Sequence, residues 1–470
     1  MALESWLIKA SVSLKSTLLN SWRRQEKAPQ VGVLAFEIAG LMSRIMHLWR
    51  SLSDNQISRL KAETITLEGI RKIVSNDDSF LLSLACAEIA ENLRLIAASV
   101  SRLGQRCRDP SLWSFDRIFM EFVKTGSDPN NWVMSFREME SKLKRMEKLV
   151  SATSGLYKEI EILSDLEGGL RKIQSDRNSN SNSKSCRAID LHQKVVWQRE
   201  EVRYLKESSI WGRSFDFVTA ILARSVFTVF SRIRLVFSIE TQWKHGSPLT
   251  RSFSATVYPS SENPNYSKPL MVKSGSLNPN EKLCNKPEKL LNKPKFFYTN
   301  SKLLNPPSST LGASALALHY ANLVLVIERL VRSPHLIGPD CRDDLYGMLP
   351  NTIRMALKSR LKAYSKSLSF SAVDPSLAGE WSKALERILQ WLSPLAHNMI
   401  RWQSERNFEQ QNLGARTSVL LLQTLYFANQ EKVEAAITEL LVGLNYIWRF
   451  ERERNNVVIV EWRGDGEFDG

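Results

Sequence analysis

Few residues of this chain have the types and spacing that catalysis requires. His319 and Asn322 lie one helical turn apart, and His397 lies in an apolar helical segment, so two histidines could meet across a helix pair. No third ligand accompanies them, which favours packed or surface histidines over a metal site. Asp343 and Asp344 are neighbours, and side chains one residue apart on a helix diverge by about 100°. Their negative charges are better explained by a position in the first turn of a helix than by a role as a catalytic acid–base pair.

Motifs of the common enzyme classes are missing from the sequence. There is no phosphate-binding Gly-x-x-x-x-Gly-Lys loop, dinucleotide fingerprint, Gly-x-Ser-x-Gly elbow, His-Glu-x-x-His pair or kinase signature. The five cysteines are widely spaced without a Cys-x-x-Cys pair, as expected for free thiols in a reducing compartment. We therefore expect a protein without enzyme activity, cofactor, metal or small-molecule substrate.

The net charge of +15 indicates a surface that attracts phosphate-rich or acidic partners. Residues 241–308 hold ten Lys or Arg against three Glu, so about half of the excess lies in one stretch. A solvated linker explains this charge more simply than a contact site does. No zinc finger, aromatic RNA-binding strand pair or basic zipper region is present, so no specific nucleic acid is predicted.

An amphipathic pattern over residues 3–22 predicts a helix at the N-terminus that could lie on an anionic membrane. The alternative, a helix packed on the protein's own core, is open. The residues of this possible membrane or partner surface are Trp6, Lys9, Lys15, Trp22, Arg23 and Arg24. No signal peptide and no apolar run long enough to span a bilayer is found.

Apolar residues recur every three to four positions through most of the chain, which predicts helices throughout. The clearest case is 82–103, where a seven-residue rhythm follows the helix-capping residues Asn76, Asp77 and Asp78. Segment 215–237 is unusually apolar, but its three arginines favour a buried helix over a membrane span. The last long stretch, 413–450, is also helical by pattern.

The sequence thus predicts an all-α protein of two helical-bundle units joined by a long, disordered, basic linker. Residues 241–308 contain nine of the seventeen prolines and lack periodicity, which is typical of such a linker. The predicted divisions are an amphipathic helix 1–28, an N-terminal helical domain 29–175, a polar linker 176–189, a helical extension 190–240 that packs on a bundle, the linker 241–308, a C-terminal helical domain 309–454 and a tail 455–470.

Two blocks of sequence resemble a plant family, the phytosulfokine-simulator (PSK simulator) proteins and their shorter relatives. The first runs from Val33-Leu-Ala-Phe-Glu-Ile-Ala39 to Glu68-Gly-Ile70. The second begins at Thr310-Leu-Gly-Ala-Ser-Ala-Leu-Ala-Leu-His-Tyr-Ala-Asn322 and includes Arg342-Asp-Asp-Leu-Tyr346, Leu357-Lys-Ser-Arg-Leu361 and Gln390-Trp-Leu-Ser-Pro-Leu-Ala396. The motif residues to which the family assigns no role are Glu37, His319, Tyr320, Asn322, Arg342, Asp343, Leu349, Pro350, Trp391 and Pro394.

The resemblance implies two domains of unknown function in a plant protein that promotes growth and is linked to peptide-hormone signalling. It brings no catalytic site, and protein partners stay unidentified. By analogy it implies an intracellular, nuclear protein, with the cytosol or the plasma-membrane periphery as alternatives. The chain begins Met1-Ala2-Leu3, so it lacks the glycine that N-myristoylation requires.

These observations leave three functional hypotheses. The first is a helical scaffold or adaptor in growth signalling, whose two units present faces to protein partners. The second is a peripheral membrane protein that binds anionic lipid through its N-terminal helix. The third, much weaker, is a helical enzyme with an unrecognised site.

Overall fold

Apolar periodicity and helix capping together build the N-terminal unit of the chain. The computed structural model describes residues 30–175, 182–238, 295–333, 338–367, 374–409 and 419–464, so the six residues of the predicted membrane surface lie outside it. Helix α5 (Asp78–Gly104) covers the predicted segment 82–103, and the Asp77 carboxylate caps it by accepting a hydrogen bond from Ser79 N at 2.9 Å. It lies beside α2 (Ala35–Ser51) and α10 (Phe215–Val236).

Shorter helices complete this unit. They are η1 (Gly32–Leu34), α3 (Asp54–Arg59), the π-helical turn η2 (Leu60–Thr64), α4 (Glu68–Ile73), α6 (Pro110–Trp113), α7 (Phe115–Thr125), η3 (Ile210–Gly212) and α11 (Lys295–Leu303). Aromatic rings from α7, α10 and α11 meet in one cluster. Phe122 stacks on Phe227 with ring centroids 4.6 Å apart, and Phe297 lies 6.0 Å from Phe119. Such ring pairs add to the stability that burial of their large apolar area provides.

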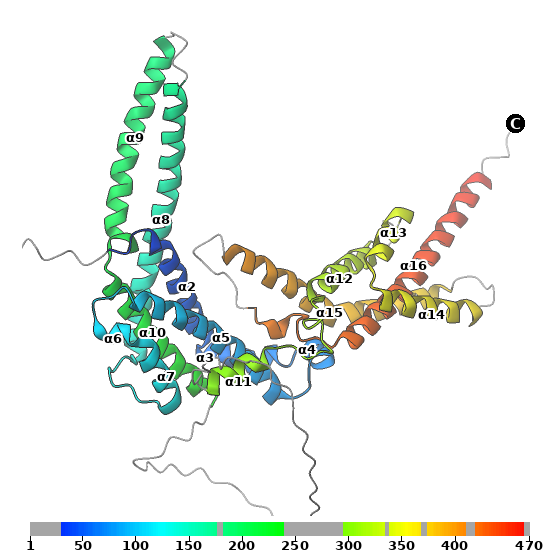
Figure 1. Cartoon of the computed structure of the whole chain (residues 1–470). Coiled ribbons are helices and arrows are strands. Elements are labelled where there is room, and N and C mark those ends of the chain that lie inside the picture. The colour runs from blue at the N-terminus through cyan, green and yellow to red at the C-terminus, as the bar shows by residue number, and fades with distance from the viewer. Residues whose placement is uncertain are drawn as a thin grey trace, which may run out of the picture.

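A helical hairpin projects from the N-terminal unit (Figure 1). It consists of α8 (Phe136–Ser175) and α9 (Asn182–Ser208), which pack side by side along their length. Gln198 lies in their seam and donates a 2.6 Å hydrogen bond to the Glu159 carboxylate. Arg199 and Glu167 join the two helices at 2.8 Å farther from the base.

The C-terminal unit contains five longer helices. They are α12 (Ala317–Arg332), α13 (Pro339–Met348), α14 (Asn351–Ser367), α15 (Pro375–Glu409) and α16 (Gln430–Gly464), with a short turn η5 (Leu421–Gln423) before the last. α15 packs on both α12 and α16, and α14 packs on α16. The described residues form no strand, and their β-type pairing is confined to two isolated bridges, Gln30 with Ser214 and Thr310 with Asn429. The all-α fold of two helical units is confirmed.

Several predicted boundaries differ from the structure. The linker 241–308 lies outside the described residues up to position 294, but residues 295–303 form α11. The reason is that Phe296 and Phe297 pack on the aromatic cluster of the N-terminal unit. The division between the domain 29–175 and the extension 190–240 also differs, because α10 lies in the same core as α2 and α5.

Two predicted non-helical stretches are helical in part. Residues 182–189 of the polar linker 176–189 belong to α9, which pairs with α8 from its first turns. The tail 455–470, with its β-prone Val457–Val460, continues α16 as far as Gly464. A helix that is already nucleated extends at little cost, so weak propensity does not end it. Conversely, residues 419–429 of the predicted helix 413–450 form a loop with the turn η5.

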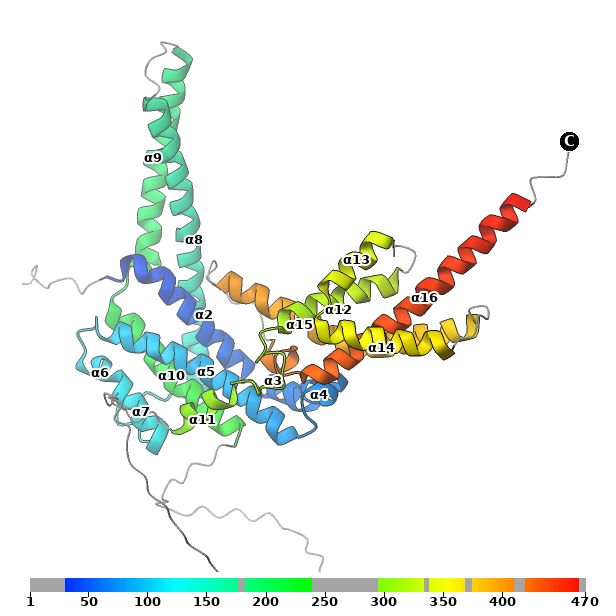
Figure 2. The same cartoon turned by 45° about the vertical axis from the view of Figure 1, so that its right-hand side comes forward.

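The two units contact each other where α4 meets α15 and α16 (Figures 1 and 2). Gly69 lies so close to α15 that a Cβ atom there would approach the Trp391 carbonyl oxygen to 2.3 Å. The Lys72 ammonium lies 5.0 Å from the centre of the Trp391 ring, a cation–π distance. Asn429 N donates to Ile73 O at 2.7 Å, and Leu421 N donates to the Glu88 carboxylate at 2.7 Å.

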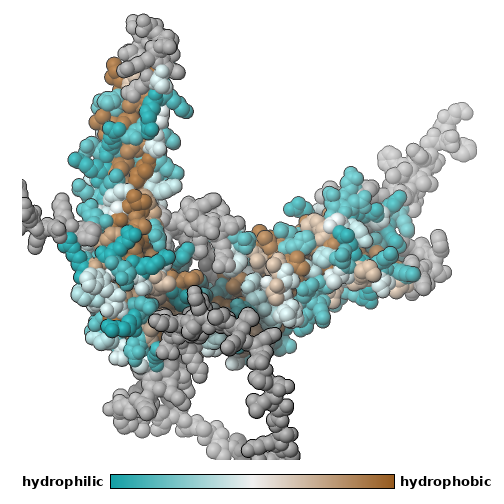
Figure 3. Space-filling view, viewed as in Figure 1, coloured by the Kyte–Doolittle hydropathy of each residue, from teal (hydrophilic) through white to brown (hydrophobic). Residues whose placement is uncertain are grey.

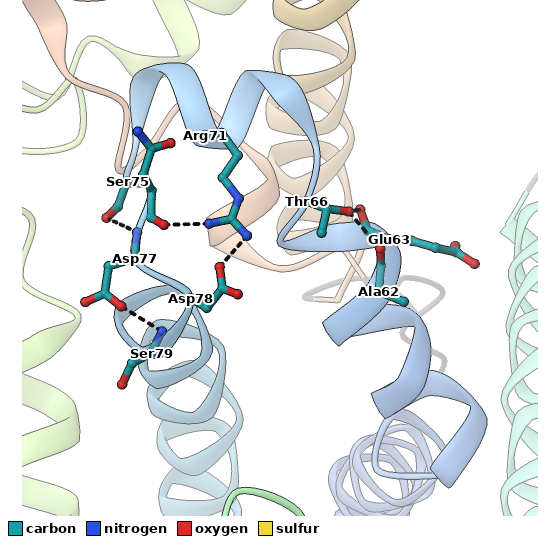
Figure 4. Close-up of polar contacts among 9 residues, drawn as sticks. Ala62, Glu63, Thr66, Arg71, Ser75, Asp77, Asp78 and Ser79 are labelled. Atoms are coloured by element: carbon teal, nitrogen blue, oxygen red, sulfur yellow. Dashed lines mark hydrogen bonds and ion pairs between the residues drawn. The ribbon is translucent and has the colours of Figure 1, made fainter. Parts of the chain in front are cut away.

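Polar contacts hold α4 in the orientation that this docking requires (Figure 4). The Arg71 guanidinium donates to Asn76 O at 2.7 Å and pairs with Asp78, so it joins the end of α4 to the start of α5. On the other side of α4, the Thr66 hydroxyl donates to Ala62 O at 2.7 Å and closes the π-helical turn. These contacts before and after α4 thus hold the helix so that Gly69 faces α15.

We expect Gly69→Ala to destabilise the protein by about 1–3 kcal/mol, because the added methyl group collides with backbone that has to move. Thermal unfolding of the full chain measures this change. Gly40→Ala is the matched control, since a Cβ at Gly40 in α2 meets nothing within 4 Å. The control should be neutral or stabilising, by up to about 1 kcal/mol. Equal effects of the two variants would contradict the close approach of α4 to α15.

Candidate binding groove in the C-terminal unit

Three helices of the C-terminal unit enclose a cavity of about 440 Å³. In each of them four of the lining residues have the spacing i, i+3, i+4, i+7 of one helical face, and Asp343 and Leu330 are additional. They are Arg342, Asp343, Leu345, Tyr346 and Leu349 from α13 and its C-terminal end, with Arg354, Leu357, Lys358 and Leu361 from α14, Leu441, Leu444, Asn445 and Trp448 from α16, and Leu330 from α12. A cavity of this size lies within the range of ligand-binding pockets.

The walls of the cavity are apolar. Leu345 and Leu349 face it from α13, Leu357 from α14, and Leu441 and Leu444 from α16, and all five are buried. These leucines are the apolar faces of three amphipathic helices that do not close fully on one another. A groove with such walls favours a ligand that brings apolar side chains of its own.

The rim of the groove is basic. The Arg342 guanidinium lies 4.2 Å from the centre of the Trp448 ring, and its Nε is buried without a hydrogen-bond partner in the described part of the chain. Arg354 lies 5.1 Å from the Tyr346 ring, and it donates to Tyr346 O and Gly347 O. Neither these arginines nor Lys358 forms an ion pair with a carboxylate among the described residues. With Asp343 as the one acid in the lining, three positive charges against one leave a net charge of +2.

The family-motif residues around the groove fix α13 in place. His319 Nε2 lies 2.8 Å from Met348 O, so the first turn of α12 holds the last turn of α13. Leu349 is buried beneath this contact, and Pro350 precedes α14, where its carbonyl accepts from Arg354 N at 3.0 Å. Proline suits the start of a helix because it lacks a donor that would go unpaired there.

Tyr320 lies in the core behind the groove and is fully buried. Its hydroxyl donates to the Glu434 carboxylate at 2.6 Å, and Gln430 donates to the same oxygen at 2.8 Å. Burial, with the Glu434 contact second, raises the pKa of the Tyr320 hydroxyl well above its ordinary value. The phenol therefore stays protonated and acts as a structural donor that ties α12 to α16.

A second buried carboxylate ties α12 to α15. Glu328 accepts from Arg332 at 2.6 Å and lies 2.8 Å from His397 Nε2. Burial on its own raises the pKa of Glu328, but the neighbouring Ser393 hydroxyl, His397 and Arg332 together lower it below the ordinary value of 4.5. The two histidines of the sequence analysis thus bond to separate partners, His319 to a carbonyl and His397 to a carboxylate.

The other motif residues lie away from the groove. Trp391 belongs to the face of α15 that receives α4, so it serves the contact between the units, whereas Pro394 is exposed within α15. Glu37 is exposed in the first turn of α2 and pairs with Arg102 at 3.5 Å. Asn322 is exposed on α12. Of the ten motif residues, Arg342, Asp343 and Leu349 line the groove.

Sequence reasoning missed the wall of the groove that α16 supplies. Trp448, Leu441 and Leu444 lie outside the two family blocks, and no motif identified them. The sequence does show that these three residues have the spacing i, i+3, i+7 of one helical face. That spacing does not say which other helices the face packs against. Arg354 and Lys358 were likewise without an assigned role.

The described residues offer little for covalent chemistry. They hold no group of three side chains that could bind a metal ion. Cys86, Cys107 and Cys341 are free thiols, and burial raises the pKa of Cys86 to about 12 and that of Cys107 to about 11. Both buried thiols are therefore protonated at neutral pH and poor nucleophiles. None of the described helices is long and apolar enough to cross a membrane.

We expect Glu328→Gln to lower the free energy of unfolding at pH 7 by about 1 kcal/mol. The value is small because Arg332 and His397 are largely exposed and solvent screens their charges. Since folding lowers the pKa of Glu328, its contribution is complete above pH 4.5 and is lost as the pH falls through the lowered value. Urea unfolding of wild type and Glu328→Gln at pH 7 and in acid measures the two free energies of unfolding. Their difference should shrink in acid, and a difference that does not depend on pH would contradict the stabilising role of the ionised Glu328.

Comparison with known proteins places both units in described domain families. Residues 33–89 match DUF3475, a domain of unknown function, and residues 310–401 match DUF668, a protein of unknown function. The first match covers α2 to the start of α5, and the second covers α12, α13, α14 and most of α15. The contact of Gly69 with Trp391 is thus a contact between these two domains. No solved structure matches the chain significantly.

Three proteins of Arabidopsis thaliana match over nine tenths of the chain. PSK simulator 1 is 28% identical over 434 residues, PSK simulator 3 is 27% identical over 437, and PSK simulator 2 is 25% identical over 442. The match covers 90% of this chain in each case but 56–61% of the relatives' own length. These matches confirm the resemblance seen in the sequence: the chain is similar to the PSK simulator proteins, and two of its segments match the DUF3475 and DUF668 families.

Proposed function

We propose that this protein is a non-enzymatic helical adaptor in growth-related signalling, and that its C-terminal groove binds an acidic amphipathic helix of a protein partner. Homology to proteins named PSK simulators supports a role in phytosulfokine-type signalling. The single observation that carries the binding mode is the groove itself, with leucine walls and a basic rim whose charges lack acidic partners in the described part of the chain.

The geometry favours a helix as the ligand. Helix-binding grooves take up apolar anchors at i, i+3 or i+4, and i+7 from one face of an amphipathic helix. Here the walls present leucines from three helices, so the anchors of a fourth helix would complete the packing. The basic rim then selects acidic residues on the flanks of that helix, since opposite charges speed association and exclude wrong partners.

Chemistry in the lining supports binding rather than turnover. No serine, cysteine or histidine lines the groove, and its charged residues are Arg342, Arg354, Lys358 and Asp343. The guanidinium charge of Arg342 has no carboxylate partner among the described residues. A partner carboxylate at the rim would neutralise this charge through a charge-assisted hydrogen bond to the guanidinium.

The membrane hypothesis concerns residues 3–27, which lie outside the described residues. It stays a prediction, and liposome co-sedimentation of the intact protein tests it. Absence of binding to anionic vesicles at low salt would remove it without affecting the groove.

A labelled model helix of about 18 residues, five turns, tests the groove directly. It should carry leucine at i, i+3, i+4 and i+7 with glutamate between, and bind to the full chain in a fluorescence-anisotropy titration. Lys358→Glu should weaken binding at least about tenfold, equivalent to about 1.4 kcal/mol, because it reverses a charge on the rim. Lys358 is exposed, so the variant should keep the fold.

Two controls make the experiment decisive. Arg329→Glu reverses an exposed charge on α12 outside the groove and should leave binding unchanged. A model helix with lysine in place of glutamate should not bind. Equal binding of acidic and basic helices, or equal loss in the Lys358 and Arg329 variants, would contradict the proposed site. Proximity labelling in plant cells with wild type and Lys358→Glu would then identify the partner.

A further inference from the structure

The projecting hairpin carries apolar side chains that its own two helices do not bury. The inward face of α9 packs on α8 through Val195, Gln198 and Val202, all buried. On the outward face, Trp197 is 75% exposed, Tyr204 66% and Ile189 65%. Figure 3 shows hydrophobic residues gathered along this hairpin. Burial of these side chains against a partner would remove their apolar area from water.

The outward apolar residues form a stripe along one side of α9, which the exposed polar residues Gln193 and Glu200 interrupt. Val196 and Trp197 each lie seven or eight positions from Ile189 and from Tyr204, which places these residues on the same side of the helix. With 3.6 residues per turn, this face lies opposite the inward seam. The stripe extends over about 22 Å, given 1.5 Å per residue between its ends. Helix α9 thus has two seams, one that α8 covers and one that is uncovered.

The stripe has the symmetry of a surface that pairs with a copy of itself. Its midpoint falls between Val196 and Trp197. If two α9 helices lie antiparallel about that midpoint, Ile189 of one copy meets Tyr204 of the other, and the four central residues pack together. Identical patches that face one another in this way form the common two-fold interface of homodimers.

Charges beside the stripe agree with the same arrangement. Lys194 and Glu201 are exposed on one flank, seven residues apart, on either side of the midpoint. In the antiparallel pair, Lys194 of each copy falls within side-chain reach of Glu201 of the other, which gives two opposite-charge contacts. In a parallel two-fold pair this flank would instead face the opposite flank of the other copy, so Lys194 and Glu201 would not meet. The self-complementary flank therefore favours a second copy of this chain over an unrelated helix.

We propose that the protein self-associates through the outward face of α9, in an antiparallel pair centred on Val196 and Trp197. The groove of the C-terminal unit is a separate surface, so the dimer would present two grooves. Self-association does not depend on the proposed function of the groove.

Sedimentation of the full chain across a range of protein concentrations tests the pairing. We expect a monomer–dimer equilibrium, and we expect Trp197→Glu to weaken it at least tenfold. Because Trp197 is exposed, the melting temperature of the variant's monomer should equal that of wild type at a concentration where both are monomeric. A chain that stays monomeric at all concentrations, or a dimer that Trp197→Glu leaves intact, would overturn the proposal.

A charge-reversal experiment separates this pairing from a general apolar contact. Lys194→Glu alone and Glu201→Lys alone should each weaken the dimer, since each places like charges in contact twice. An equimolar mixture of the two variants should form heterodimers as stable as the wild-type dimer, because both contacts become attractive again. The double variant in one chain should likewise restore pairing. Failure of the mixture to associate would exclude the antiparallel arrangement.

Discussion

The backbone contact between Gly69 of α4 and Trp391 of α15 is the constraint on which the arrangement of the whole chain depends. It joins residues more than three hundred positions apart, and it does so at a distance that no side chain larger than hydrogen permits. Two further hydrogen bonds join the units: Asn429 N donates to Ile73 O, and Leu421 N donates to the Glu88 carboxylate. Because polar backbone groups are paired there, the contact is directional and fixes the relative orientation of the two units.

This orientation matters for the groove, because α16 belongs to both contacts. Its N-terminal end meets α4, and the residues from Leu441 to Trp448 form one wall of the cavity. Tyr320 and Glu434 hold α16 against α12 between these two points. A shift at the interface between the units would therefore move the wall that carries Trp448, the ring on which Arg342 rests. The family motif around Trp391 and the motif around Arg342, which are separate in sequence, thus act on one helix.

Sequence reasoning predicted the elements well and their partners poorly, for a physical reason. The seven-residue rhythm of 82–103 and the capping carboxylate at Asp77 are local signals, and α5 follows them. Helix α11 has no such rhythm and forms because Phe297 meets Phe119, a contact between segments far apart in sequence. The same applies to the site: the resemblance marked Arg342 and Leu349, but Trp448 enters the groove through tertiary packing, which periodicity does not encode.

The two proposed binding surfaces differ in the kind of free-energy cost that a partner would remove. In the groove, leucines of three helices are partly shielded by one another, and the basic rim adds a cost of unpaired charge that an acidic ligand removes. On α9, Trp197 and Tyr204 stand in solvent, and the cost is apolar area that a symmetric copy would bury. In these proposals the first surface would select an acidic partner by charge, and the second would select its own copy by apolar contact and complementary flanking charges. Because α8 and α9 carry the second surface away from the groove, occupation of one does not block the other (Figure 1). A protein with both properties can gather two partners at once, which is what an adaptor requires.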